Sequence, residues 1–351
     1  MYSSGMSRVA QLLSTFSGFS KNQPLLFDCG STVTRVFFEG KLLAEEPTCI
    51  AVHAESGSTV AVGAKAVSLL GKVSDKFQVE FPIAHGEISS PSLLQKFLEV
   101  VVSKFDTTVF SKVMGFPVVL VVPSELSPVQ KTIFEETFKK AGFRSVVLIP
   151  QAETLLEKLG AGGEHESFCY LDFGGQKSEF GIFTLNEKIK SMTVRTGGVQ
   201  LTEIIQEHIR LVHNLEVSWH VAEQVKREAC SFVGLVPGGG RVAATKVAIR
   251  GKDVVTQAGK TVTVSSADFL ESFGFVVEEL IDALQFFFAS VPAHLVASSL
   301  EDGIFMTGGM SQMTGLKELL EHTFSSPVYV HKHPDLDSIE GLHLRVSKHE
   351  I

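Results

Sequence analysis

The segment Phe27–Ser31 has the sequence FDCGS, and the segment Leu171–Gly175 repeats it as LDFGG. Each segment ends an apolar run, places Gly two residues after Asp, and is followed by a hydroxyl side chain at Thr34 or at Ser178. An Asp-x-Gly step of this kind is typical of a tight turn between two strands. A phrase that recurs in the same strand context predicts a duplicated architecture. We therefore expect two similar halves, each a sheet covered by helices, that face each other across a cleft.

The repeated turns have the chemistry of phosphate-binding loops. Glycine lets the backbone approach a ligand closely and point its N–H groups at phosphate oxygens. Asp28 and Asp172 are placed to hold the waters of a Mg²⁺ ion, because magnesium keeps most of its water shell in proteins. Gly308-Gly309 follows a third apolar strand and completes a set of three loops. We predict a polyphosphate site; the alternative is that all three are merely hairpin turns.

Composition sets the class of protein. The chain has 351 residues, 44% of them hydrophobic and 20% charged, which is enough for two folded cores. A net charge of -8, without a long run of Lys and Arg, argues against a protein that coats nucleic acid. The cysteines are far apart and form no CxxC pair, which argues against a zinc site and predicts reduced thiols at Cys29, Cys49, Cys169 and Cys230.

The N-terminal segment has apolar side chains at mostly helical spacing between Met6 and Phe19. No apolar run in the chain approaches the ~20 residues of a membrane span, and a secretory signal is a poor fit. Two interpretations stay open: a tail or a helix packed on its own domain, and an amphipathic helix that lies in a membrane interface. The second would insert Val9, Leu12, Leu13, Phe16 and Phe19.

In their order and spacing, the motifs of this chain resemble those of the MreB family of bacterial actin-like proteins, and more distantly actin and the heat-shock chaperone ATPases. The resemblance extends from about Leu25 to Val346. It implies an α/β, actin-like ATPase fold, with two duplicated RNase H-like domains around a nucleotide cleft. The matching segments are Asp28–Thr34, Glu46–Thr48, Ala61–Lys65, Pro82–Ile88, Val122–Ser124, Asp172–Glu179, Arg195–Gly198, Ala222–Glu228 and Thr307–Gly309.

The resemblance also implies a domain organisation. We expect an N-terminal amphipathic segment at 1–21, domain I at 22–150 together with 333–351, and domain II at 151–332. Each domain should contain a five-stranded mixed sheet. The outer subdomains should occupy about 43–80 and about 196–263.

ATP or ADP with Mg²⁺ is the ligand that the resemblance implies. The Mg²⁺ ion would be held through water by Asp28 and Asp172. The residues expected to contact the nucleotide are Asp28, Gly30, Ser31, Thr32, Val33, Thr34, Gly174, Gly175, Gln176, Glu223, Gln224, Val225, Lys226, Gly308, Gly309, Met310 and Ser311.

The chain departs from the family pattern where the family hydrolyses ATP. The MreB second loop reads Asp-Ile-Gly-Gly-Gly-Thr-Thr-Glu, but here Gln176 replaces the third Gly and Lys177 replaces the first Thr. Gln151 stands in place of the catalytic Glu, and an amide is a very weak base; Glu153, two residues on, should point elsewhere. Lys177 either contacts the γ-phosphate or blocks the attacking water. Val33 replaces the usual Asn. We expect nucleotide binding with weak or absent hydrolysis.

The function that the resemblance implies is that of a cytoskeletal protein. It would bind ATP, form filaments on the inner face of the cell membrane, and organise cell shape and wall synthesis from the cytoplasm. Its partners would be further copies of itself, inner-membrane lipid and cell-wall elongation or shape proteins, but no nucleic acid. Two alternatives stay open. One is a non-hydrolysing actin-like scaffold, and the other is a small-molecule kinase of the same superfold, for which Asp172 is the one evident base.

Overall fold

The computed structural model describes residues 23–70, 76–104, 115–160, 166–238 and 245–349. The chain divides into two compact units. The first comprises Met1–Val67, Asp75–Thr154 and Ser338–Ile351, and the second comprises Ser68–Ser74 and Leu155–Asp337. The domain and subdomain limits expected from the sequence remain predictions.

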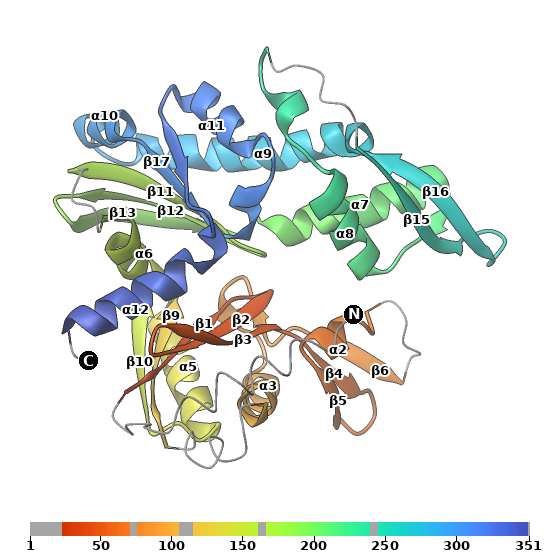
Figure 1. The fold of residues 1–351 in the computed structure, drawn as a ribbon, viewed down its shortest axis with the longest axis horizontal. Helices are drawn as coiled ribbons and strands as arrows, with labels where there is room; N and C mark the ends of the chain where they lie inside the picture. Colours follow the sequence, from red (N-terminus) through yellow and green to blue (C-terminus); the bar gives the residue numbers. More distant parts are fainter. Residues whose placement is uncertain (1–22, 71–75, 105–114, 161–165, 239–244, 350–351) are drawn as a thin grey trace. The chain divides into compact units, whose positions relative to one another are not determined.

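A five-stranded mixed sheet forms the centre of the first unit (Figure 1). Three of its strands form an antiparallel meander: β1 (Leu25–Cys29), β2 (Val33–Phe38) and β3 (Lys41–Pro47). Two further strands continue the sheet in parallel beyond β1: β9 (Pro117–Val122) and β10 (Ser145–Pro150). The side chains of β9 after its first residue are buried, as expected for an interior strand that is covered on both faces.

The second unit repeats this arrangement around another five-stranded mixed sheet. Its meander consists of β11 (Ser167–Phe173), β12 (Ser178–Thr184) and β13 (Glu187–Val194). The parallel strands are β17 (Ile304–Thr307) and β18 (Val328–Val330). Since both sheets have the same strand order and directions, the duplicated α/β architecture predicted from the Asp-x-Gly repeat is confirmed.

The helix α5 (Pro128–Lys140) begins with two sequence features that favour a helix start. Ser127 caps α5 by accepting a hydrogen bond from the N–H of Gln130, and a proline occupies its first turn. A small three-stranded sheet and a two-stranded hairpin complete the unit. The remaining elements are β4 (Ile50–His53), β5 (Thr59–Val62), α2 (Ala64–Val67), β6 (Phe77–Glu80), β7 (Ile83–Ala84), β8 (Glu87–Ile88), α3 (Pro91–Ser103), α5 (Pro128–Lys140) and, except for its first residue, α12 (Asp337–His349). The boundary between the two units falls within α6 (Gln151–Leu159), after Thr154.

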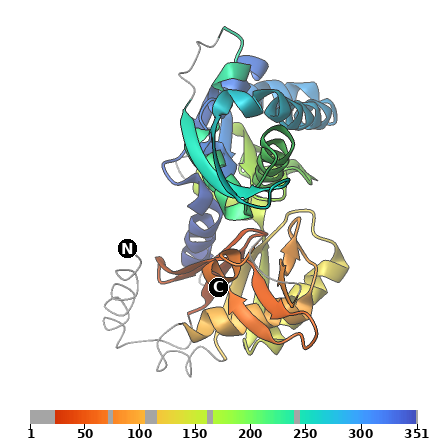
Figure 2. The same ribbon diagram turned by 90° about the vertical axis from the view of Figure 1, so that its right-hand side faces the viewer.

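In the second unit, a long helix follows a reciprocal cap in which Ser265 and Asp268 each bond the other's backbone. The helices and strands outside the central sheet are α7 (Gly198–His213), β14 (Leu215–Glu216), α8 (Trp219–Ala229), β15 (Lys246–Asp253), β16 (Gly259–Ser265), α9 (Ser266–Ala289), α10 (Ala293–Asp302) and α11 (Leu316–Phe324). The helices α7 and α8 lie beside the β15–β16 hairpin (Figure 1 and Figure 2). No helix in the described part of the chain is long and apolar enough to span a bilayer.

The strand β11 separates two kinds of side chain. Cys169, Leu171 and Phe173 are buried in a core that also contains residues of α7 and α9. Tyr170 and Asp172 alternate with them and therefore point to the opposite face of the sheet. The apolar side chains thus anchor β11 in the core, and the opposite face of the strand carries the polar groups of Tyr170 and Asp172.

The cysteines are all buried and free, as the sequence predicted. Burial raises the pKa of the Cys49 thiol and of the Cys230 thiol to about 12. These thiols therefore behave as small apolar side chains.

Candidate functional site

The turns that follow β1 and β11 have the same geometry. The N–H of Gly30 donates to the carbonyl of Val33, and the N–H of Gly174 donates to the carbonyl of Lys177, with an N···O distance of 3.0 Å in both turns. A Cβ atom on either glycine would lie 2.8 Å from the same carbonyl oxygen, closer than real side chains approach. The repeated Asp-x-Gly sequence therefore reflects the same steric requirement in both turns, namely a residue without a Cβ atom.

The first loop is fastened to two segments that belong to the family pattern. The Ser31 hydroxyl accepts a hydrogen bond from the N–H of Gly86 at 3.1 Å. The hydroxyls of Thr34 and Thr48 lie 2.8 Å apart, and the N–H of Thr48 donates to the carbonyl of Thr32 at 2.9 Å. Thr34 and Thr48 are fully buried. These contacts tie the first loop to two other segments of the first unit.

The pair Gly197-Gly198 holds the second loop. The N–H of Gly198 donates to the carbonyl of Gly174 at 3.0 Å, and the N–H of the residue after Gly198 donates to the carbonyl of Gly175 at 2.7 Å. A Cβ atom on Gly197 would lie 2.7 Å from both carbonyl oxygens. The sequence analysis did not include this pair among the site residues. Two consecutive glycines after Thr196, at the start of α7, are nevertheless a sequence signal that two backbone segments pack closely.

The third loop also meets the second one backbone to backbone. Gly308 has φ +83°, and a Cβ atom there would lie 2.4 Å from the carbonyl oxygen of Phe173. The Ser311 hydroxyl donates back to the carbonyl of Gly308 at 2.6 Å. Gly309 faces open space, since a Cβ atom on it would have no neighbour within 4 Å. Met310, in contrast, is buried in the core of the second unit and anchors the third loop there.

The two aspartates stand at corresponding positions, each on the strand that leads into a glycine turn. Asp172 is 6% exposed, and its Oδ1 accepts a hydrogen bond from the Thr307 hydroxyl at 2.9 Å. Asp28 is half-buried at the end of β1. No cluster of three or more His, Cys, Asp or Glu side chains in the described ranges could hold a metal directly. Each of these carboxylates, taken by itself, has the chemistry to accept hydrogen bonds from the waters of a Mg²⁺ ion.

Lys177 has a partner that the sequence interpretation did not consider. Its Nζ lies 3.2 Å from Oε2 of Glu179, a side chain with no exposed surface. The other carboxylate oxygen of Glu179 accepts the Tyr170 hydroxyl at 2.9 Å. A buried carboxylate needs such compensation, because an unpaired charge in a protein interior is costly. Gln176, next in the loop, is half-buried.

Glu223 and Lys226, two of the α8 residues predicted to contact adenosine, lie beside the Gly197-Gly198 pair that holds the second loop. The Lys226 ammonium donates to the carbonyl of Gly198 at 2.7 Å and pairs with Glu223 at 2.7 Å. Burial raises the pKa of the Glu223 carboxyl, but Lys226, Arg227 and Thr202 together hold it below its ordinary value. Burial lowers the pKa of Lys226, and Glu223 only partly offsets this. The pair is thus a half-buried ionic anchor between α8 and the start of α7.

The other two predicted contacts on α8 are placed differently. Val225 is fully buried in the core. Gln224 is exposed, and its amide donates to Glu228 at 2.9 Å. The structure therefore brings Glu223 and Lys226 to the loops but not the two residues between them, because residues one position apart point in different directions on a helix.

Gln151 opens α6 and is 8% exposed. Its amide donates to the Ser338 hydroxyl at 3.1 Å. The Ser124 hydroxyl accepts from the N–H of the next residue, Ala152, at 2.9 Å. Glu153 pairs with Arg345 at 2.6 Å, so Gln151 and Glu153 both contact α12, at residues seven positions apart.

The predicted membrane-contacting residues lie outside the described part of the chain. They are Val9, Leu12, Leu13, Phe16 and Phe19.

Comparison with known proteins places the chain in context. A family model described as "MreB/Mbl protein" matches residues 22–350. The chain is 26% identical over 332 residues to the cell shape-determining protein MreB of Escherichia coli K12, covering 92% of each chain. It is 24% identical over 313 residues to the cell shape-determining protein Mbl of Bacillus subtilis 168, covering 88% of this chain and 90% of the relative.

Solved structures agree with the fold. MreB5 of Spiroplasma citri bound to AMPPNP superposes with a TM-score of 0.84 at 19% identity, covering 95% of this chain and 98% of that one. The MamK double helical filament superposes with a TM-score of 0.71 at 17% identity, covering 93% and 99%. At these identities the likeness establishes the actin-like fold.

Proposed function

This chain belongs to the MreB/Mbl family, and from that premise we propose that it binds ATP or ADP and assembles with further copies of itself into filaments. The observation that carries the proposal is the matched pair of glycine turns at Gly30 and Gly174, each closed by a 3.0 Å hydrogen bond. Two similar structures are described as bound to AMPPNP and as a double helical filament. The proposal extends both properties to this chain.

In the proposed site, the phosphates contact the turns Gly30–Thr34 and Gly174–Gln176. The adenosine contacts Glu223 and Lys226 on α8 and the loop Gly308–Ser311. A bound Mg²⁺ would neutralise phosphate charge while Asp28 and Asp172 accept hydrogen bonds from its waters. A Cβ atom on Gly309 would have no neighbour within 4 Å, and this open space would give a ligand room at the third loop.

We propose that hydrolysis is weak or absent, so that the protein acts as a nucleotide-dependent scaffold. Gln151 can orient a water but takes up a proton poorly. Its amide donates to Ser338, and Glu153, the next carboxylate along α6, pairs with Arg345. Lys177 brings a charge where the family has a small hydroxyl.

We also propose the cellular setting that the family suggests. The filament would lie in the cytoplasm on the inner face of the cell membrane, with residues 1–20 in contact with lipid. It would act in cell shape and wall synthesis together with cell-wall elongation or shape proteins.

Calorimetry with ATP and Mg²⁺ tests the nucleotide site. Asp172→Ala should abolish magnesium-dependent binding, because the proposed water ligand is removed. Asp302→Asn is the matched control: this carboxylate holds the other end of β11 by accepting the N–H of Ser167 at 3.0 Å, far along the strand from the loops. Unchanged affinity in Asp172→Ala would contradict the site. Sedimentation with and without ATP tests filament formation separately.

A further inference from the structure

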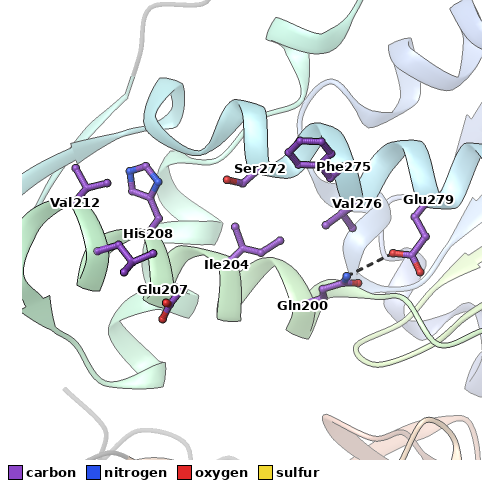
Figure 3. A pocket seen from close by; sticks show the side chains of 10 residues that line it. Gln200, Ile204, Glu207, His208, Val212, Ser272, Phe275, Val276 and Glu279 are labelled. Carbon is purple, nitrogen blue, oxygen red and sulfur yellow. Dashed lines mark hydrogen bonds between the residues drawn. The ribbon is translucent and has the colours of Figure 1, made fainter.

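A groove runs between α7 and α9 in the second unit (Figure 3). Its volume is about 360 Å³, and its more buried lining comes from Ile204, His208 and Val276. The residues on the α7 side, from Gln200 to Val212, recur at intervals of three and four and therefore belong to one helix face. No part of the proposed nucleotide site lines this groove.

Large apolar side chains stand exposed along the groove. Leu211 is 63% exposed, Val212 60% and Phe275 67%. Phe286, 70% exposed, lies three turns further along α9 on the same face, about 16 Å away at 1.5 Å per residue. Scattered exposed apolar residues are ordinary, but a row of them beside a groove marks an interaction site. Because the row continues past the groove, an extended ligand fits better than a compact one.

The same surface is acidic. The helix α9 contains five carboxylates and neither Lys nor Arg, and helical spacing puts all five on the face that carries Phe275 and Phe286. Within the described residues, Glu271, Glu278 and Asp282 form no ion pair. The five carboxylates are Asp268, Glu271, Glu278, Glu279 and Asp282.

A polar end closes the groove near the start of α7. The Gln200 amide donates to Glu279 at 3.5 Å, and Glu279 also accepts the Thr196 hydroxyl at 2.6 Å. The Oε1 atom of Gln200 is buried without a hydrogen-bond partner in the described part of the chain. A buried acceptor without a donor is costly, so this end offers a position for an incoming N–H group.

We propose that the groove between α7 and α9 docks a basic amphipathic helix of a partner protein. Apolar residues of that helix, three and four positions apart, pack between Leu211 and Phe275, which is the usual mode of helix recognition in a groove. Lysine and arginine on its flanks face the carboxylates of α9, which guide its orientation and raise the rate of association. A second copy of this chain is a poorer occupant, since each copy carries a net charge of -8.

Fluorescence anisotropy with a designed probe tests the proposal on the full chain. The probe is a labelled peptide of about 18 residues, or five turns, with leucine at helical spacing and lysine elsewhere. Its control is a peptide of the same composition in shuffled order. The probe should bind at least tenfold more tightly than the shuffled peptide, and the double change Leu211→Ser with Phe275→Ser should remove most of that difference.

Two further variants separate the apolar and the charged contributions. Glu278→Gln with Asp282→Asn should flatten the salt dependence of probe binding, because fewer ion pairs form. Val255→Ser removes an apolar side chain that is 76% exposed but lies outside the groove, and it should leave binding unchanged. Equal binding of the shuffled peptide, or full binding by the serine double variant, would overturn the proposal. Loss of self-association in that variant, measured by analytical ultracentrifugation, would assign the groove to a second copy instead.

Discussion

The ammonium of Lys177 lies 3.2 Å from Oε2 of Glu179, and the carboxylate of Glu179 has no exposed surface. Lys177 directly precedes β12 and Glu179 is the second residue of that strand, so side chains two positions apart along the extended backbone point to the same side. Asp172 is the cross-strand neighbour of Glu179 on that face. The ammonium therefore offsets one of two adjacent carboxylates beside the second glycine turn, at a position where the MreB family pattern has an uncharged Thr.

Removing the charge of Lys177 should destabilise the protein. Lys177→Met keeps the apolar stem but leaves Glu179 buried without its cation, and breaking a buried pair in this way costs about 3 kcal/mol. Urea unfolding followed by circular dichroism measures the loss. Glu179→Gln in the same chain should recover most of it, since an amide oxygen still accepts the Tyr170 hydroxyl. A Lys177→Met chain as stable as the parent would contradict this account.

Lys177 should also weaken the dependence of nucleotide binding on magnesium. Compared with Thr at this position, the site carries one more positive charge, which attracts phosphate without a metal. Calorimetry in Mg²⁺ and in EDTA should show a smaller loss of ATP affinity for the parent chain than for Lys177→Thr. Lys177→Arg, which keeps the charge, is the control. An equal loss in all three chains would exclude a role for the charge.

Restoring the family residues should restore hydrolysis. Gln151→Glu with Lys177→Thr supplies a carboxylate base and frees the place of the attacking water, and a positioned base contributes on the order of 100-fold or more. Phosphate release under filament-forming conditions measures the gain. Glu153→Gln should have no effect, because Glu153 pairs with Arg345. No gain while ATP still binds would mean that other positions limit turnover.

The residues of α8 illustrate what the sequence could predict. The family motif predicted Glu223, Gln224, Val225 and Lys226 as one set, but a helix turns about 100° per residue. Only the first and last of the four therefore share a face, and these two lie beside the Gly198 support. Helical spacing thus places Val225 in the core and Gln224 on the surface, and the nucleotide contacts of all four residues remain predictions.

The glycine turns were predictable and the groove was not. The turns at Gly30 and Gly174 depend on a local steric condition that a few residues of sequence express. The five-stranded sheets follow from the strand order that this repeat implies. The groove depends on how α7 packs against α9, some sixty residues later in the chain, and the burial of Glu179 depends on Tyr170 in the neighbouring strand.

His208, which lines the groove, should make stability depend on pH. Burial lowers the pKa of His208 below 6.5, and His213 lowers it further while Asp268 raises it. The unfolded chain therefore binds the proton first as pH falls, so this contribution to stability is full above pH 6.5 and is lost as pH falls through the folded pKa. Unfolding midpoints at about pH 7.5 and about pH 5.5 should differ less in His208→Gln than in the parent. His220→Gln, an exposed site, is the control; the same narrowing there would contradict the assignment.

Residues 1–20 should bind lipid. Val9, Leu12, Leu13, Phe16 and Phe19 would form the inserted face of a helix, and burying several such side chains contributes on the order of several kcal/mol. Arg8 and Lys21 are the only Lys or Arg side chains in or next to this segment that could attract anionic lipid. Binding should therefore change little with salt or with the content of anionic lipid. One short helix binds weakly, but a filament presents many copies at once. The test compares how the full chain and a chain beginning at Asn22 sediment with liposomes. Equal sedimentation of the two chains would exclude this segment as the membrane anchor. If neither chain sediments with liposomes in the presence of ATP, membrane binding itself is excluded.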